Sequence, residues 1–153
     1  MTAMNETFEA AKLSEVECCP GRIHGTLTKL QIRPTRQRVE LAWLLFSKGN
    51  RHLTAEMLFD EANHARINVS LATVYNFLNT FARSGLLRQI SVDGSKTYFD
   101  TNTSHHHHFF VEDQNALIDI PSVDVQLDQI PQELNDYHLS RIDVVIRIRR
   151  KAS

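Results

Sequence analysis

The spacing of apolar side chains changes once along the chain, from a helical period to a period of two. From Thr35 to Ser47 the apolar residues recur as they would on one face of a helix. Two further segments of this kind follow Thr54 and Ser70, which are residue types that cap helix N-termini, and the second of them ends at Gly85. The pattern therefore predicts three consecutive helices.

A strand-like pattern begins after the third helical segment. Residues 86–92 and 96–100 are short strand candidates, and Asp93-Gly94 between them is a strong signal for a hairpin turn. Three helices followed by a hairpin are typical of a winged helix-turn-helix. In that arrangement the third helix, which begins after Ser70, lies in the major groove of DNA.

The rest of the chain predicts a second and smaller unit. Strand-like segments lie at residues 105–111, 116–120 and 141–149, and a helix is expected over residues 122–137, shortened by Pro131. A unit of about 50 residues is too small to bury a sizeable core alone, so we expect it to pair with a copy of itself.

We therefore predict an α+β protein, in which an N-terminal winged helix-turn-helix DNA-binding domain precedes a small α/β dimerisation domain. The expected boundaries are a flexible N-terminal segment over residues 1–27, the DNA-binding domain over 28–101 and the dimerisation domain over 102–153. The chain has 153 residues, of which 42% are hydrophobic and 23% charged, as is usual for globular proteins.

The cysteines and the hydropathy favour a cytoplasmic protein without a membrane partner. The two cysteines, Cys18 and Cys19, are adjacent, and neighbouring cysteines seldom pair, so no disulfide framework is expected. No apolar run approaches the length of a membrane span, and the acidic N-terminus does not resemble a signal peptide. Because the chain has no C-x-x-C pattern, any metal must be bound by histidine and carboxylate.

Charge is distributed unevenly behind a net charge of -1. Residues 21–51 contain seven Lys or Arg side chains and Glu40 alone as an acid, whereas residues 112–136 contain seven acids and no Lys or Arg. A basic segment of this kind suits a polyanion such as double-stranded DNA.

Polar and basic residues lie where a winged helix meets DNA. Arginines crowd the start of the first helix, where phosphate or minor-groove contacts add affinity. The third helix offers short donors and acceptors for base edges, and the hairpin offers two cations for the backbone. The candidate DNA-binding residues are Arg33, Arg36, Arg38, Ser70, Thr73, Tyr75, Asn76, Arg88 and Lys96.

Four consecutive histidines, residues 105–108, begin the strand-like segment that follows the hairpin. The run is not expected to be a purification tag, because tags lie at a terminus. The alternative to a binding site is a solvent-exposed strand end. If the segment is extended, His105 and His107 point to one face and His106 and His108 to the other. Neutral imidazole is a ligand for zinc, iron and haem iron, so the run could supply two sites.

Four segments together resemble the ferric uptake regulator family. They are "RPTRQR" (33–38), "HLTAEMLF" (52–59), "VSLATVYNFLNTFARSGLL" (69–87) and the histidine run, within a resemblance that covers residues 28–149. The resemblance implies a dimeric winged-helix repressor whose second half senses metal. It places Arg33 in the minor groove and Tyr75 against a base, while Asn76 stands where many members have arginine, which leaves the operator sequence open.

The same resemblance implies a metal site at the hinge between the two domains. His52, expected on the second helix, and Asp100 match family ligands, and the candidate site is completed by His106, His108 and Asp119. A second metal or haem site would use His105 and His107, although Gln126 stands where the family has a glutamate. Residues 111–114 replace the family's C-x-x-C, so no structural four-cysteine zinc site is expected.

The loss of that cysteine site and the enriched histidine run resemble the iron response regulator branch of the family. This branch implies a repressor that senses haem and loses DNA binding or stability when haem binds. It also implies haem and a haem-synthesis enzyme as partners. Cys19-Pro20 resembles the haem regulatory motif of some members, and the alternative is an exposed thiol in an unstructured tail.

Two alternatives remain open at this point. The chain could be a ferrous-iron, manganese or zinc sensor of the same family, with His52, Asp100, His106 and His108 as ligands. From another class, two histidines and one carboxylate could form the non-haem iron site of an enzyme. No nucleophile–base pair or cofactor loop stands out, so we expect no enzymatic activity.

Overall fold

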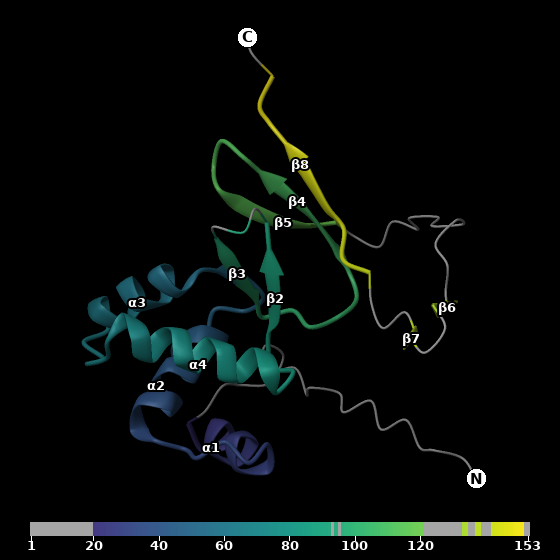
Figure 1. Ribbon diagram of the computed structural model, residues 1–153. Helices are drawn as coiled ribbons and strands as arrows, with labels where there is room; N and C mark the ends of the chain where they lie inside the picture. The colour runs from purple at the N-terminus through teal and green to yellow at the C-terminus, as the bar shows by residue number, and fades with distance from the viewer. Residues whose placement is uncertain are drawn as a thin grey trace. The chain divides into compact units, whose positions relative to one another are not determined.

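The protein divides into two compact units, one up to Thr103 and one from Ser104, and each is described here by itself. The structure is a computed structural model that describes residues 20–92, 94, 96–120, 133–134, 137–138 and 142–151 (Figure 1). Cys19 and most of the predicted helix at residues 122–137 lie outside these residues. No helix in the described ranges is both long enough and apolar enough to cross a membrane.

The first unit contains the three predicted helices. They are α2 (Arg36–Phe46), α3 (Ala55–His64) and α4 (Leu71–Arg83). The two predicted N-caps are confirmed, because the hydroxyls of Thr54 and Ser70 accept hydrogen bonds from the backbone N–H groups of Met57 and Thr73. Each cap satisfies a donor that the helix itself leaves unpaired, which stabilises the helix by about 1 kcal/mol.

Apolar side chains from these helices form the core of the first unit. Leu41, Leu58 and Leu78 are fully buried, and the rings of Phe77 and Phe81 pack with their centroids 4.1 Å apart. Each such side chain contributes about 1.5–3 kcal/mol through burial alone. The core therefore fixes how α3 and α4 lie against each other.

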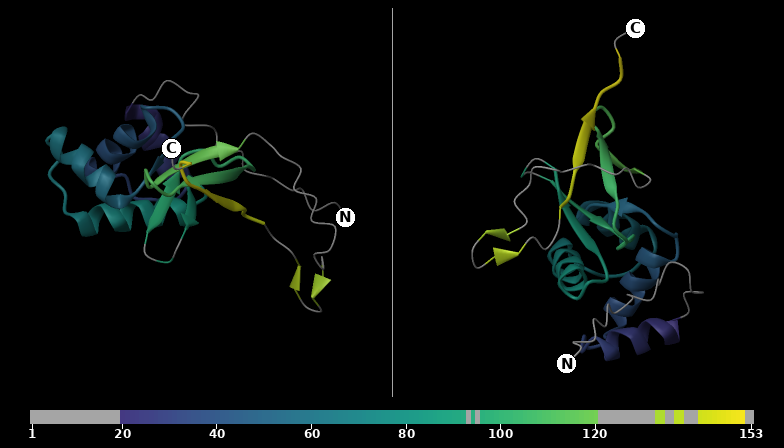
Figure 2. Two further views of the ribbon diagram at one scale, coloured as in Figure 1. Left: turned by 90° about the horizontal axis from the view of Figure 1, so that it is seen from above. Right: turned by 90° about the vertical axis from the view of Figure 1, so that its right-hand side faces the viewer.

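A fourth helix, α1 (Pro20–Lys29), lies where the sequence predicts a flexible segment. It packs against α2 on the side away from the hairpin (Figures 1 and 2), and it buries Ile23 and Leu27. The only apolar signal for this helix is that one pair at a spacing of four, which is too short a pattern to identify a helix from sequence.

The predicted hairpin pairs β2 (Arg88–Ser91) with β3 (Thr97–Asp100), and Gly94 between them has a positive φ of 76°. A short strand, β1 (His52–Leu53), pairs with the other edge of β3, which gives the order β1-β3-β2. The prediction that His52 lies on a helix is wrong, because the helix begins only after Thr54. A strand of two residues is too short to show alternating hydrophobicity in the sequence, and it forms only because it pairs with β3, which is distant in the chain.

The second unit contains a sheet in the order β5-β4-β8. It is built from β4 (His107–Val111), β5 (Ala116–Ile120) and β8 (Val145–Ile148), all at predicted positions, with β4 antiparallel to β5 and parallel to β8. In the segment predicted as a helix, the residues that are described form two short paired strands, β6 (Glu133–Leu134) and β7 (Tyr137–His138).

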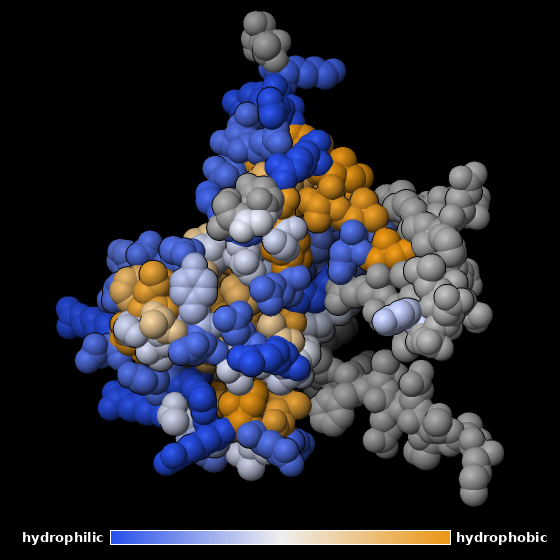
Figure 3. Space-filling model, viewed as in Figure 1, coloured by the Kyte–Doolittle hydropathy of each residue, from blue (hydrophilic) through white to orange (hydrophobic). Residues whose placement is uncertain are grey.

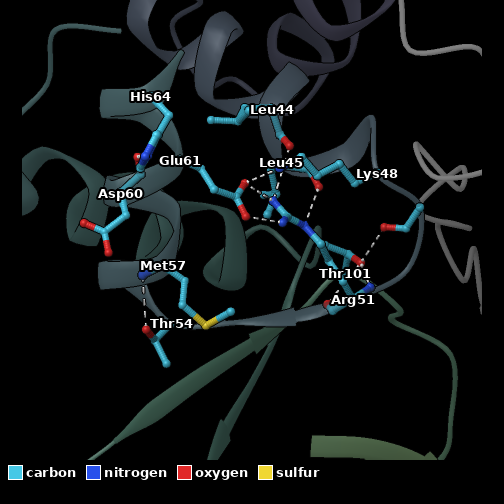
Figure 4. Close-up of polar contacts among 11 residues, drawn as sticks. Leu44, Leu45, Lys48, Arg51, Thr54, Met57, Asp60, Glu61, His64 and Thr101 are labelled. Carbon is cyan, nitrogen blue, oxygen red and sulfur yellow. Dashed lines mark hydrogen bonds and ion pairs between the residues drawn. The ribbon is translucent and has the colours of Figure 1, made fainter. Parts of the chain in front are cut away.

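One partly buried arginine, Arg51, joins α2, α3 and the end of β3 in the first unit (Figure 4). The guanidinium of Arg51 forms two hydrogen bonds to the carboxylate of Glu61, at 2.7 and 2.9 Å. It also donates to the carbonyls of Leu44 and Leu45 at the end of α2, and its backbone N–H donates to Thr101 at 2.8 Å. Arg51 therefore stabilises the C-terminus of α2 and holds the first unit together.

Glu61 binds both Arg51 and Lys48. Desolvation by burial would raise the pKa of Glu61, but the hydrogen bonds and charges of Arg51 and Lys48 outweigh it and hold the pKa below its usual value. A carboxyl whose pKa is lowered by folding stabilises the protein above its unfolded pKa of about 4.3. That stability is lost as the pH falls through the lower folded value.

We expect Glu61→Gln to lower the free energy of unfolding at pH 7 by about 1–3 kcal/mol, because it removes a charged partner of Arg51. Denaturant unfolding followed by circular dichroism measures this, and the difference from the unsubstituted protein should shrink below about pH 4. Glu40→Gln, in the exposed pair with Arg36, is the matched control and should cost about 0.5 kcal/mol or less. A loss in Glu61→Gln that is no larger than in the control would contradict this role of Glu61.

Candidate functional site

The register of β1 and β3 places a histidine opposite an aspartate in the first unit. His52 and Asp100 are direct cross-strand partners, and His52 Nε2 lies 3.4 Å from Asp100 Oδ2. The Asp100 side chain is fully buried, and its Oδ1 accepts a hydrogen bond from the backbone N–H of Asn102 at 2.7 Å. That bond fixes the orientation of the carboxylate and leaves its other oxygen facing the imidazole.

The register of β4 and β5 makes the same kind of pair in the second unit. His108 is the cross-strand partner of Asp119, and His106 lies two residues earlier on the same side. Asp119 Oδ1 lies 3.3 Å from His106 Nε2 and 3.6 Å from His108 Nε2, and the two imidazole rings have their centroids 4.6 Å apart. This grouping of residues 106, 108 and 119 confirms the predicted alternation of the histidine run.

The hydrogen bond of His106 Nδ1 indicates the tautomer of its ring. His106 Nδ1 lies 2.8 Å from the backbone carbonyl of Ser104, and because a carbonyl only accepts, Nδ1 carries the proton. In the neutral ring Nε2 then presents a lone pair, and it presents it to an oxygen of Asp119 that is also an acceptor. Two acceptors that face each other require a cation between them, either a further proton or a metal ion.

A metal ion fits this set of donor atoms. A divalent ion accepts lone pairs from both rings and from Asp119 together, and the three ligand atoms lie within 4.8 Å of one another. The contact of His106 Nδ1 with a backbone carbonyl is the usual outer support of a metal-bound histidine.

The donor types indicate which ions the residues suit. Imidazole nitrogen with carboxylate oxygen is a ligand set for zinc, iron and manganese. Both the pair His52 and Asp100 and the set His106, His108 and Asp119 have this composition. The prediction that all five serve one ion at the hinge stays a prediction.

The other two histidines face the opposite side of β4. The rings of His105 and His107 lie 5.7 Å apart edge to face, and His107 Nδ1 is buried with no hydrogen-bond partner among the described residues. The same face of the sheet continues through Phe109, Ile118 and Ile146, which are cross-strand neighbours. Half or nearly half of the Ile118 and Ile146 surfaces is exposed. This face combines imidazole nitrogen with an apolar surface.

Several predicted DNA-binding residues are exposed on the first unit. Tyr75 and Asn76 lie on α4, and Arg33 and Arg36 lie at or before the start of α2. Ser70 caps α4 and contacts Thr73 through its hydroxyl. The guanidinium of Arg38 donates a hydrogen bond to the backbone carbonyl of Arg33 at 2.9 Å. Arg38 thus supports the backbone of the arginine-rich segment.

Arg88, predicted to contact the DNA backbone, is buried. Its side chain is only 4% exposed, so it is not presented to a DNA backbone as a hairpin cation would be. The reason is the alternation along β2, which turns Arg88 and Ile90 inward, with Arg88 directly opposite Asp100. Lys96, the second cation of the hairpin, is exposed as predicted.

The basic segment also contributes less free charge than its composition suggests. Lys48 and Arg51 are paired with Glu61, and Arg36 is paired with Glu40. The sequence did not identify Glu61 or a second acidic residue, Glu56, as partners of functional side chains. Glu56 accepts a hydrogen bond from the Tyr75 hydroxyl on α4, and no local pattern reveals a contact between residues so far apart in the chain.

Comparison with known proteins gives one consistent answer. The model of a family described as the ferric uptake regulator family matches residues 29–148. The chain is 29% identical over 118 residues to the peroxide-responsive repressor PerR of Staphylococcus epidermidis, across 76% of this chain and 77% of that protein.

Solved structures agree with the family match. The ferric uptake regulator of Pseudomonas aeruginosa with manganese is 26% identical, has a TM-score of 0.66 and aligns over 85% of this chain and 98% of that chain. The ferric uptake regulator of Vibrio cholerae shares the fold, with a TM-score of 0.68 at 21% identity, over 83% of this chain and 98% of that chain.

We expect His106→Ala and His108→Ala each to lower the affinity for zinc or cobalt(II) by about tenfold or more, since each removes one of the two imidazoles beside Asp119. Titration followed by calorimetry, or by the visible absorption of bound cobalt, measures this. The matched control is His64→Ala, an exposed histidine on α3 whose Nδ1 contacts the carbonyl of Asp60. Unchanged metal affinity in both ligand variants would show that residues 106 and 108 are not ligands.

Proposed function

The chain belongs to the ferric uptake regulator family, and on that premise we propose that it is a metal-responsive transcriptional regulator, mainly a repressor, that binds promoter DNA as a homodimer. Its relatives are named as repressors and uptake regulators, so an enzymatic role as a non-haem iron protein has no support among them. The observation that carries the proposal is the grouping of two imidazoles around one carboxylate, with Asp119 Oδ1 3.3 Å from His106 Nε2 and 3.6 Å from His108 Nε2. As a regulator of promoters it would work in the cytoplasm.

The DNA-reading part of the proposal rests on α4 and the segment before α2. The N-terminus of α4 is capped by Ser70, and the exposed side chains of Tyr75 and Asn76 present hydrogen-bonding groups of the size that base edges require. The exposed Arg33 and Lys96 would neutralise phosphates, which adds affinity and salt dependence but no sequence information.

The sensing part rests on the two ligand sets. We assign His52, Asp100, His106, His108 and Asp119 as metal ligands, because imidazole nitrogen and carboxylate oxygen together suit zinc, iron and manganese. A ligand changes DNA affinity only if it binds one arrangement of the protein more tightly than another. The proposal therefore requires that metal affinity and DNA affinity change together.

The dimer part rests on the sheet of the second unit. Its edge strand β8 carries Ile146 and Ile148 with about two fifths of their surfaces exposed, and Ile118 on β5 is half exposed. Apolar side chains gather on this unit in Figure 3. A small sheet with one apolar face is stabilised when a copy covers it, which is the reason we give for a homodimer.

We propose further that haem is the signal that this regulator senses. The nitrogen of His107, with the His105 ring beside it, offers an imidazole ligand of the kind that haem iron takes. We propose that haem binding there lowers DNA binding or stability. A role for Cys19 and a haem-synthesis enzyme as partner stay predictions from the resemblance.

A second candidate within the same class is a sensor of ferrous iron, manganese or zinc alone. The observation that favours it is the group of His106, His108 and Asp119, whose ligand atoms lie within 4.8 Å of one another and suit a single free ion. The two candidates differ in whether residues 105 and 107 matter for the response.

For the DNA interface, we expect Arg33→Ala to weaken duplex affinity by about three- to thirtyfold and to reduce its salt dependence by about one counterion, because one phosphate contact is lost. Metal affinity should not change. Fluorescence anisotropy over a range of salt concentrations measures the first effect. Arg150→Ala, which removes an exposed charge of the same sign from the second unit, is the control. Equal losses in the two variants would contradict the assignment of Arg33.

For haem, we expect the full chain to shift the Soret band of added haem, and the double variant His105→Ala/His107→Ala to lose that shift. The matched control is His24→Ala/His64→Ala, which removes two exposed histidines from helices and should keep the shift. A shift that survives the loss of residues 105 and 107 would contradict haem ligation there. No shift in the unsubstituted protein would favour the free-metal sensor.

A further inference from the structure

The side chain of Tyr75 on α4 is held by an acidic residue of the neighbouring helix. Its hydroxyl donates a hydrogen bond to Glu56 Oε1 on α3, with an oxygen–oxygen distance of 2.5 Å. Tyr75 is 38% exposed, and it lies beside Asn76 on the surface of α4 that we assign to base contacts. The contact therefore lies within the DNA-reading surface and not in the core.

The charges around this pair keep the proton on the tyrosine. The hydrogen bond from Tyr75 is the main cause that lowers the pKa of Glu56. A backbone N–H, Thr54 and Lys96 also lower it, and burial opposes them. The same bond raises the pKa of Tyr75. Because an ionised carboxylate has no proton to give, the Tyr75 hydroxyl is the donor and Glu56 the acceptor.

This direction of the hydrogen bond decides what Tyr75 can offer to DNA. Its only proton is directed at Glu56, so the remaining hydrogen-bonding capacity of the hydroxyl is its lone pairs. In the major groove, lone pairs accept from the amino groups of cytosine and adenine, whereas the oxygens of guanine and thymine require a donor. The ring stays available for contact with a thymine methyl group.

We propose that Glu56 is a specificity-determining residue of this regulator, because it fixes the Tyr75 hydroxyl as a hydrogen-bond acceptor toward base edges. The inference rests on the proposed function, since it assumes that α4 reads duplex DNA. Glu56 itself is a positioning residue and contacts no base. It also holds one Tyr75 side-chain orientation before DNA binds, which reduces the conformational entropy lost on binding.

The test compares base preference in five proteins: the unsubstituted chain, three variants of the Glu56–Tyr75 pair and one control variant. The preferred duplex of the unsubstituted chain is first selected from a randomised library in the presence of zinc or manganese. Affinities for that duplex and for each of its single-base-pair variants are then measured for Glu56→Ala, for Tyr75→Phe and for the double variant. Glu40→Ala is the matched control, because it removes an acid of the same charge from an exposed pair on α2.

We expect Tyr75→Phe to lower discrimination at one base pair by about tenfold. Glu56→Ala should relax discrimination at the same base pair, because the freed hydroxyl can then also donate, and the double variant should have the preference of Tyr75→Phe alone. Glu40→Ala should raise affinity for all duplexes alike through lost repulsion. A separate measurement follows the ionisation of tyrosine by ultraviolet absorbance. The chain has three tyrosines, and the signal of Tyr75 is obtained by subtracting the titration of Tyr75→Phe. We expect Glu56→Ala to lower the Tyr75 pKa.

Two outcomes would overturn the inference while leaving the proposed function intact. One is a Glu56→Ala protein that binds DNA with the unsubstituted preference or changes only by the uniform factor of Glu40→Ala. The other is an unchanged Tyr75 titration, which would show that the hydrogen bond is absent in solution. Failure of the unsubstituted chain to bind any duplex in a salt-dependent manner would instead contradict the proposed function itself.

Discussion

The pairing register of two short antiparallel ladders is the constraint on which the candidate site depends. It sets His52 opposite Asp100 in the first unit and His108 opposite Asp119 in the second. A shift of one residue in either ladder would turn the histidine and the aspartate to opposite faces, because successive side chains alternate. The positions of both histidine–aspartate pairs therefore depend on the strand pairing.

Apolar neighbours enforce that register. Leu53 pairs with Phe99 next to the first ligand pair, and Phe110 pairs with Leu117 close to the second, and all four side chains are buried. Slipping either ladder would expose these side chains at a cost of about 1.5–3 kcal/mol each. Hydrophobic burial thus positions the histidine and the aspartate of each pair. The same principle acts in the helices, where buried contacts between α3 and α4 bring Glu56 to Tyr75.

The sequence was sufficient for features whose signals are local. The caps Thr54 and Ser70, the alternation of residues 105–108 and the strand over residues 116–120 each depend on a few neighbouring residues, and the structure agrees with them. The family assignment also came from contiguous segments. What the sequence missed depends on partners that are distant in the chain: the strand that carries His52, the inward turn of Arg88, and the ion pair of Arg51 with Glu61. Composition counted Arg51 as a cation for DNA, but an arginine held by a carboxylate and two helix carbonyls is a structural residue.

The central claim is that imidazole and carboxylate ligands, fixed by strand register, couple metal binding to the DNA affinity of the first unit. Thermodynamic linkage requires such coupling to be reciprocal. The most direct test measures the affinity of the full chain for its selected duplex with a chelator and with saturating metal, and the metal affinity with and without that duplex. The account predicts that both affinities change by the same factor, about five- to 150-fold. A duplex affinity that is the same with chelator and with metal would contradict it.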